Sequence, residues 1–371
     1  MPAGLFRPIS PDKQTLGTVP TNRNNLKDLF TLEVLSYFYK KNVFRPLLRT
    51  RDIPEGNKSA VFEVSGKAAK GVLFKPGDTL DKKGVPHARK IINIDGLVVA
   101  SDWIFKLDDW LAYWDVRHEH AQALGVQLAE AVDRNLFASV LKAAATNKAL
   151  VKNPDGTEKT LSGKVININA SSIVKVSDID TKEKVILFVE AVGKARTAFR
   201  KMNVYDQELY LAISPSMYEK LFNYLDLISA DYKGSGSIAE GELPRLFGFN
   251  IVESNVFYEG EGNDNDLGEL YTVSGSPKTA TIGEDWSGDG GINHKVTVQG
   301  GGLLAVAFTR DAAAMVNLKD IYVEEDYDIK EKATYITADL AAGFDSFRPE
   351  CAIAIMGKGG TLELPSLVLT S

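Results

Sequence analysis

Residues 108–145 constrain the fold of this chain more than any other stretch. They contain no proline, and apolar side chains recur every three or four residues, which is typical of a helix with one buried face. The apolar positions are Leu111, Trp114, Ala121, Leu124, Leu128, Val132, Leu136 and Val140. At 1.5 Å per residue, such a helix extends roughly 50 Å or more. This length is unusual in a compact enzyme and favours a helix that runs along an extended molecule.

A long two-stranded ribbon is predicted just before this helix. Strand-like residues at 59–74 and 90–99 flank a turn signal at 75–78 and a polar tip at 81–84. Because an isolated hairpin is marginally stable in water, the ribbon must pack on its own domain or on another subunit. Residues 26–41 are predicted to form a helix whose apolar face has no partner nearby in the sequence.

The rest of the chain mixes helices and strands without the regular alternation of a parallel α/β sheet. Helices are predicted at 182–201 and 215–227, and strands at 165–168, 209–213, 248–252, 303–308, 320–325, 331–342 and 348–356. We therefore expect an α+β fold, and 371 residues are too many for one small core. Residues 258–300 are acidic and glycine-rich, so we expect a solvated insertion there, and 357–371 are expected to form a tail.

The charge distribution argues against a dedicated nucleic-acid-binding protein. The chain has a net charge of −6, whereas DNA-binding domains are usually basic. Residues 258–291 contain eight acids and one base, a net of −7 that leaves the remainder at about +1. The densest basic run is Lys40, Lys41, Arg45, Arg49 and Arg51. It is either a solvated charge run or a weak, sequence-independent contact with DNA.

No catalytic or metal-binding pattern emerges from the sequence. His118 and His120 lie two residues apart on the predicted helix, so they point to different faces and cannot share one ion. The single cysteine, Cys351, lies among small apolar residues and is expected to be an inert buried thiol. The aromatic residues at 103–114 alternate with aspartates, which favours packing over base stacking. We predict no enzyme, no cofactor and no metal site.

The start of the chain lacks the charged and apolar stretches of a signal peptide, and no apolar run is long enough to cross a bilayer. With a single cysteine, no intrachain disulfide can form. We expect production in a reducing cytoplasm and no membrane association.

Several short strings stand in an order and spacing typical of one protein family. They are Asn57–Phe62, Pro76–Asp81, Ile92–Leu97 and Tyr113–Arg117, with Glu33–Leu35 upstream and Arg348–Glu350 near the end. Through them the chain resembles the major capsid protein of short-tailed bacteriophages related to phage T-seven. The likeness is close over 25–145 and looser over 182–356.

The resemblance implies the Hong Kong 97-type capsid fold. On that template the chain divides into an N-terminal arm (1–57), an extended E-loop ribbon (58–100), a P-domain with the spine helix (101–182), an A-domain (183–319) with the acidic insertion 258–300, a return to the P-domain (320–356) and a C-terminal tail (357–371). The E-loop tip, with Asp81, Lys82 and Lys83, would contact a neighbouring subunit. The basic run at 40–51 would face the genome.

The resemblance also implies the partners of the chain. Copies would form pentamers and hexamers of an icosahedral head, assembled in the host cytoplasm, that encloses double-stranded DNA without sequence specificity. Scaffolding protein and portal would assist assembly, and a decoration protein would be a further partner. Two alternatives remain open at this stage. One is an encapsulin, a cellular shell of the same fold, and the other is a glycan-binding or hydrolytic surface protein.

Overall fold

The structure is a computed structural model. It describes residues 21–66, 73, 84–94, 96–111, 116–148, 150–151, 162–168, 173–204, 207–223, 245–258, 261–262, 267–268, 272–273, 276–285 and 293–364. The chain divides into two compact units, and α3, β15 and β16 each contribute residues to both. Unit one comprises Met1–Asn42, Leu97–Ala131 and Lys319–Ala341. Unit two comprises Val43–Gly96, Val132–Leu318 and Ala342–Ser371. No helix in the described part of the chain is long and apolar enough to span a bilayer.

Unit one combines helices with one end of a twisted sheet. Its elements are α1 (Thr21–Lys41), β4 (Gly96–Phe105), α2 (Lys106–Leu111), the first half of α3 (Val116–Ala145), the second half of β15 (Ala313–Asp328) and the first half of β16 (Ala333–Ser346). The sheet to which these strands belong has the order β1-β15-β16-β4, in which β4 is an edge strand. Along β4, and along β16 from Ile336 to Leu340, buried residues alternate with more exposed ones, as expected for a sheet with one covered face.

The helix predicted without a partner, α1, packs on α3 of the same chain. Val34 and Phe38 of α1 are buried, as are Leu124 and Leu128 of α3. The two helices approach closely at Gly125, where an added Cβ would lie 2.7 Å from the Val34 carbonyl oxygen. A glycine inside a helix costs about 1 kcal/mol relative to alanine, and here that cost permits the close approach. In the described part of the apolar face of α1, Phe30, Val34 and Phe38 are therefore buried within the subunit.

Unit two contains the larger core. A six-stranded mixed sheet has the order β5-β17-β14-β6-β8-β7, and β14 at its centre is buried along its whole length. The strands are β5 (Lys164–Asn167), β6 (Leu209–Ile213), β7 (Arg245–Leu246), β8 (Phe249–Glu253), β14 (Leu303–Thr309) and β17 (Ala352–Met356). The helices are α4 (Lys182–Met202), α5 (Pro215–Asn223) and the short 3₁₀ turns at Val176–Asp178, Asn255–Tyr258 and Pro349–Cys351.

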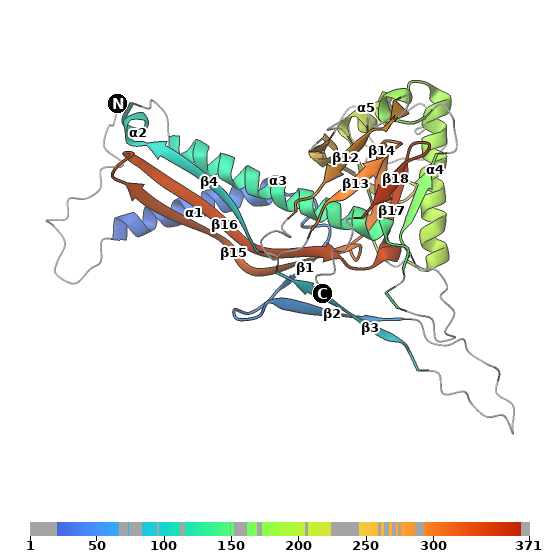
Figure 1. The fold of residues 1–371 in the computed structure, drawn as a ribbon, viewed down its shortest axis with the longest axis horizontal. Coiled ribbons are helices and arrows are strands. Elements are labelled where there is room, and N and C mark those ends of the chain that lie inside the picture. Colours follow the sequence, from blue (N-terminus) through green and yellow to red (C-terminus); the bar gives the residue numbers. More distant parts are fainter. Residues whose placement is uncertain are drawn as a thin grey trace. The chain divides into compact units, whose positions relative to one another are not determined.

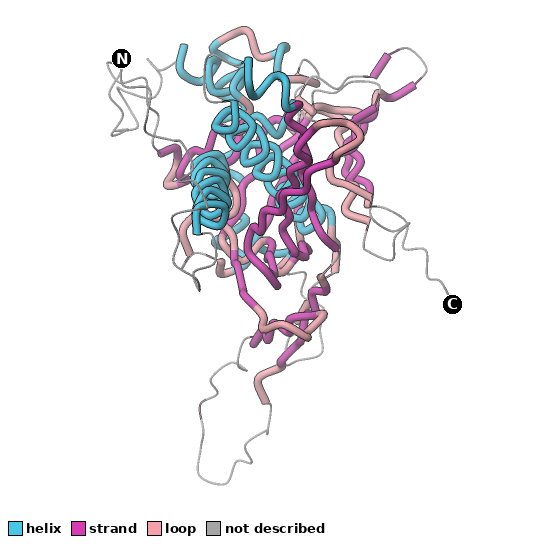
Figure 2. The backbone as a smooth tube through the Cα atoms, turned by 90° about the vertical axis from the view of Figure 1, so that its left-hand side faces the viewer, coloured by secondary structure: helices cyan, strands magenta, loops and turns pink. Residues whose placement is uncertain are grey.

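Unit two also holds two smaller sheets and the ribbon. A four-stranded sheet has the order β18-β13-β12-β9, and β10 pairs with β11. These strands are β9 (Glu261–Gly262), β10 (Thr272–Val273), β11 (Ser276–Pro277), β12 (Thr279–Ile282), β13 (Val296–Gln299) and β18 (Thr361–Glu363). The ribbon strands β2 (Ser59–Ser65) and β3 (His87–Asn93) lie side by side in both views (Figures 1 and 2), and β1 (Arg49–Asp52) pairs in parallel with β15.

The structure corrects four expectations from the sequence. The predicted strand 90–99 is two strands in different sheets, since β3 ends at Asn93, where Gly343 closely approaches the Asn93 carbonyl, and β4 begins at Gly96. The predicted helix 108–145 is divided between α2 and α3, with residues 112–115 outside the described part. The acidic segment 258–300 is not a loop throughout, because β12 and β13 pair within it and bury apolar residues. The predicted tail 357–371 includes β18, which pairs with β13.

The buried face of α3 gives the first prediction. Leu128 is 1% exposed, so Leu128→Asp would place an unpaired charge in the core and lower the free energy of unfolding by at least about 4 kcal/mol. We expect loss of the cooperative transition in a thermal melt followed by circular dichroism.

The matched control is Gln127→Asp, one residue earlier on the exposed side of the same helix. It should melt within a few degrees of the wild type. A cooperative melt of Leu128→Asp at the wild-type temperature would contradict the burial of this face.

Candidate functional site

The base of the ribbon packs on its own subunit. β2 and β3 pair over seven residues, from Ser59–Asn93 to Ser65–His87. Every second side chain of β2 is buried, and the Phe62 ring lies 5.3 Å from the Phe347 ring, centroid to centroid. The buried cluster at this base consists of Ala60, Phe62, Val64, Ile92, Ala314, Val316 and Phe347. Of the two supports that the sequence left open, the base of the ribbon uses its own domain.

A buried ion-pair centre fixes this base. Asp345 of β16 is 7% exposed, and its carboxylate accepts from Lys90 Nζ at 2.6 Å and from Lys142 Nζ at 2.9 Å. Lys90 belongs to the ribbon and Lys142 to α3, so one carboxylate ties three elements together. Burial by itself raises the pKa of Asp345, but the two ammonium groups outweigh it and hold the pKa below its ordinary value.

The opposite face of the ribbon is exposed. On this face an apolar cross-strand pair is followed by a charged one. Val61 and Ile91 face each other and are 41% and 56% exposed. Beyond this apolar pair, Arg89 Nη2 lies 3.2 Å from Glu63 Oε1. An exposed ion pair of this kind contributes little to stability. This exposed face therefore combines an apolar pair, Val61 and Ile91, with a neighbouring charged pair, Glu63 and Arg89.

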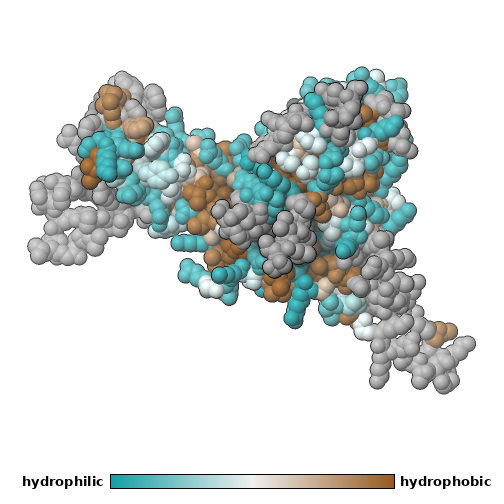
Figure 3. All heavy atoms as spheres, viewed as in Figure 1, coloured by the Kyte–Doolittle hydropathy of each residue, from teal (hydrophilic) through white to brown (hydrophobic). Residues whose placement is uncertain are grey.

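A second exposed apolar surface lies along the edge strand β4. Its outward side chains are Leu97, Val99, Ser101, Trp103 and Phe105. Leu97 and Trp103 are 64% and 50% exposed, and the Trp103 and Phe105 rings lie 5.8 Å apart. Apolar surface is visible in the region of β4 and β16 in Figure 3. We call these outward side chains the β4 face, and contiguous apolar surface of this kind marks an interaction site.

The β4 face also corrects the interpretation of the aromatic cluster. Packing was expected for the aromatic residues at 103–114, yet Trp103 and Phe105 remain largely exposed. The side chains at 108–110 and residues 112–115 lie outside the described part of the chain. The alternation of large apolar residues from Leu97 to Phe105 was the signal that could have revealed this face from the sequence.

The predicted basic residues do not act alike. Arg49 Nε lies 3.0 Å from Asp311 Oδ1, and Arg51 Nη1 donates to the Val61 carbonyl oxygen at 2.7 Å. These two arginines take part in the packing of β1. Lys40 and Lys41 are exposed in the last turn of α1, a position that suits the negative end of the helix dipole, and Lys40 Nζ lies 5.5 Å from the Tyr37 ring centre. Arg45 is partly buried in the turn after α1.

The E-loop tip residues Asp81, Lys82 and Lys83 lie outside the described residues. The structure therefore leaves their inter-subunit role as a prediction.

The two histidines of α3 point to different faces, as the sequence predicted. His118 contacts α1, with Nδ1 3.3 Å from Glu33 Oε2 and Nε2 3.0 Å from the Tyr37 hydroxyl. His120 contacts Asp102 of β4 through a short hydrogen bond. They hold neighbouring elements and are not simply solvated. Within the described residues, no cluster of three metal-ligating side chains occurs.

The cysteine is buried, as expected. Burial raises the pKa of Cys351 to about 12, so the thiol is not ionised near neutral pH and is unsuited to nucleophilic chemistry.

The ion-pair centre gives the second prediction. Asp345→Asn preserves shape but leaves Lys90 and Lys142 without a counter-charge, so we expect a loss of about 3 kcal/mol in the free energy of unfolding at neutral pH. Because the folded-state pKa is depressed, the wild-type contribution is complete above the unfolded pKa of about 3.9 and disappears as pH falls through the folded value. Urea denaturation between pH 3 and 7 measures it.

The control is Asp180→Asn, which removes an exposed carboxylate 2.7 Å from Lys184. It should leave the urea midpoint nearly unchanged at pH 7. If Asp345→Asn shows the same acid sensitivity as the wild type, the ion-pair centre does not anchor the ribbon.

Comparison with known proteins gives consistent matches. A family model described as Gp10A-like major capsid protein matches residues 61–356, well over half of the chain. The major capsid protein of Enterobacteria phage T3 is 27% identical over 335 residues, which is 88% of this chain and 90% of that protein. The major capsid protein of Escherichia phage T7 is 26% identical over 337 residues, which is 89% of this chain and 91% of that protein.

A solved structure is also similar. The capsid structure of the cyanophage P-SCSP1u matches with a TM-score of 0.63 and 24% sequence identity, covering 85% of this chain and 88% of that chain.

Proposed function

The chain belongs to the Gp10A-like major capsid protein family, and from that premise we propose that the ribbon tip of one copy binds an acidic groove on the next. As a member of this family it is a structural protein of the phage virion, not an enzyme, and it self-associates into the head shell. Its α+β architecture is the Hong Kong 97-type fold of phage capsids. The family assignment favours a capsid over the encapsulin and glycan-binding alternatives.

The acidic groove is the observation that supports this contact. It lies on β15 and β16, has a volume of about 370 Å³, and is lined by Glu324, Glu325, Asp326, Tyr335 and Thr337. Asp339 of β16 interacts electrostatically with the groove. Burial raises the pKa of Asp339, and the negative charge of Glu324 in the groove raises it further. Crowded carboxylates of this kind are stabilised when a cation binds.

The predicted E-loop tip supplies cations of the right kind. Lys82 and Lys83 are adjacent in the sequence at the polar end of the ribbon. One exposed lysine–carboxylate pair is worth only about 0–1 kcal/mol. A closed shell repeats the contact at every subunit, so the charge pairs select the register while apolar surface supplies most of the affinity. The ribbon's Val61–Ile91 pair and the β4 face are two of the exposed apolar surfaces that could serve that purpose.

The third prediction tests this contact by charge exchange. Lys82→Glu with Lys83→Glu should leave the subunit folded and weaken shell formation, because the tip would then repel the groove. Glu324→Lys with Glu325→Lys should do the same from the other side. A chain with all four changes should recover assembly, measured by electron microscopy and analytical ultracentrifugation.

The control is Glu183→Lys with Glu190→Lys, which changes the net charge equally at exposed positions of α4. It should assemble like the wild type. Normal shells from the Lys82 and Lys83 variant would refute the proposed contact.

The remaining partners extend the same proposal. Hexamers and pentamers assembled in the host cytoplasm would form the shell, with scaffolding protein and portal as assembly partners and a decoration protein on the outside. The packaged double-stranded DNA would contact the basic run weakly. Lys40 and Lys41 are the members of that run best placed for this contact, because Arg49 and Arg51 already make contacts within the subunit.

The fourth prediction concerns DNA. Binding of the purified chain to duplex DNA should be weak, independent of sequence and strongly salt-dependent. Lys40→Gln with Lys41→Gln should reduce the slope of log affinity against log salt by about one to two. Lys194→Gln with Lys201→Gln, exposed on α4, is the control and should keep the wild-type slope. Tight binding to one defined sequence would contradict the proposal.

A further inference from the structure

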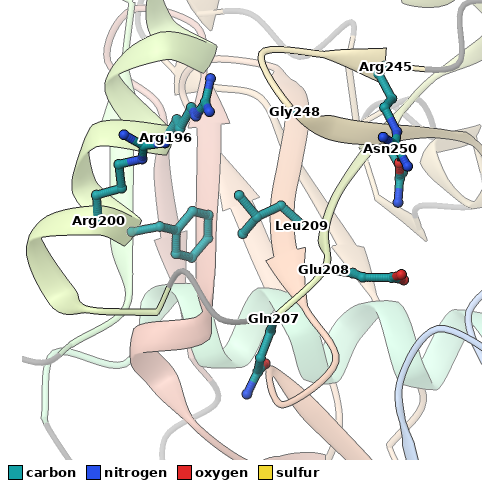
Figure 4. A pocket seen from close by; sticks show the side chains of 9 residues that line it. Arg196, Arg200, Gln207, Glu208, Leu209, Arg245, Gly248 and Asn250 are labelled. Carbon is teal, nitrogen blue, oxygen red and sulfur yellow. The ribbon is translucent and has the colours of Figure 1, made fainter.

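A pocket of about 260 Å³ lies in unit two between α4 and the strands β6, β7 and β8 (Figure 4). Arg196 and Arg200 line it from α4, and Arg245 and Asn250 line it from the opposite side. Its remaining lining is Phe199, Gln207, Glu208, Leu209 and Gly248. The pocket thus combines three guanidinium groups with an apolar floor of one phenyl ring and one leucine side chain.

Local structure places Arg245 opposite the helix. β7 and β8 are joined by a two-residue turn in which Phe247 and Gly248 both have positive φ, at 48° and 82°. A turn of this kind matches the twist of an antiparallel pair. Arg245 and Asn250 are cross-strand partners beside the turn, and Arg245 Nε donates to Asn250 Oδ1 at 3.0 Å. This bond orients the guanidinium and leaves its terminal nitrogens for another acceptor.

The charges in the pocket are unbalanced. Arg196 and Arg200 are four residues apart, so their side chains are neighbours on the helix surface, and like charges at this spacing are destabilising. Within the described part of the chain, neither has a carboxylate partner within ion-pair distance. The one acid in the lining, Glu208, accepts a hydrogen bond from the Tyr210 hydroxyl at 2.6 Å. The lining of the pocket therefore has a net positive charge, which favours the binding of an anion.

The shape of the pocket favours a carboxylate side chain over a nucleic acid. Guanidinium groups bind planar carboxylates through two parallel hydrogen bonds, and the apolar floor suits the methylene groups of a glutamate. Duplex DNA presents its phosphates on a broad convex surface, which a small recess does not match.

The chain itself contains an acidic segment of the required chemistry. Five of its acids fall within eleven residues, at 259, 261, 264, 266 and 269, without an intervening base. The pocket belongs to the six-stranded sheet and α4, whereas β9, at residues 261–262, belongs to the four-stranded sheet. Two different complementary surfaces on one chain are what a head-to-tail contact around a ring requires.

We propose that the Arg196–Arg200–Arg245 pocket of one copy binds a carboxylate from the acidic segment 259–269 of an adjacent copy in the same ring. This inference rests on the ring-forming shell function proposed above but not on the ribbon contact. It assigns to the acidic segment a binding role within the capsomer.

Two charge-reversed chains test the proposal. The pocket variant has Arg196→Glu and Arg200→Glu, and the acid variant has Glu259→Lys, Asp264→Lys and Asp266→Lys. Each alone should remain folded by circular dichroism and should need a protein concentration roughly tenfold or more above the wild type to assemble. Lys194→Glu with Lys201→Glu, which reverses two exposed charges of α4 outside the pocket, is the control and should assemble normally.

Mixing the two variants shows whether the contact joins separate copies. In an alternating ring, every reversed pocket meets a reversed acidic segment and every native pocket meets a native one. An even ring satisfies this rule and an odd ring cannot. The mixture should therefore form hexamers but not pentamers, as seen by native mass spectrometry and electron microscopy. A single chain with all five changes should form both.

Three outcomes would overturn the proposal. The first is normal assembly of the pocket variant. The second is recovery in the five-change chain without recovery in the mixture, which would place the contact within one subunit. The third is a pocket variant that forms shells but fails to retain DNA, which would assign the pocket to the genome. The ribbon variants are assayed in parallel, so a failure of the ribbon contact is distinguishable from a failure of this one.

Discussion

The carboxylate of Asp345 is the point on which the arrangement of unit two depends. It lies near the end of β16, it is buried, and it accepts from a lysine of the ribbon and a lysine of the long helix. Two ammonium groups offset the cost of burying one carboxylate, and the apolar cluster around Phe62 and Phe347 excludes water from the same place. A two-stranded ribbon gains a fixed base in this way, although a free hairpin would be marginal.

Because the subunit itself fixes the base of the ribbon, the described base does not need a neighbour in order to form. The helix α1 leads to the same conclusion, since its apolar face is covered by α3 at Gly125. Both elements had suggested missing partners when only the sequence was considered. Among the apolar surfaces that remain exposed in the described part of the chain are the outer Val61–Ile91 pair and the β4 face. The buried sides of these strands stabilise the subunit, and their exposed sides are the ones that we propose for association between subunits.

The sequence predicted features that depend on local periodicity and missed those that depend on a close approach in space. The long helix, the arm helix, the ribbon base and most strands followed from spacing of apolar residues. The end of β3 at Asn93 was missed, although Asp95-Gly96 is a local turn signal, and the close approach of Gly343 to the Asn93 carbonyl, some 250 residues later, could not be foreseen from spacing. Asp345 likewise has no local signal that identifies Lys90 and Lys142 as its partners. Arg196 and Arg200 have a visible four-residue spacing, but the β7–β8 turn that brings Arg245 opposite them does not follow from spacing alone.

Positive and negative charges are segregated along the chain, which the net charge of −6 does not reveal. Acids are concentrated in 258–291 and on β15, whereas three arginines line the pocket beside α4 and lysines occupy the predicted ribbon tip. Identical copies repel each other if every surface is acidic, and they attract each other if opposite charges occupy different faces. A head-to-tail contact between unlike faces closes into a ring, and the same segregation opposes face-to-face pairing of two acidic surfaces. Exposed charge pairs are individually weak and screened by salt, so single contacts can form, break and be corrected. In the contacts proposed above, exposed apolar side chains would hold the completed shell, because apolar contacts are not screened by salt and repeat at every subunit.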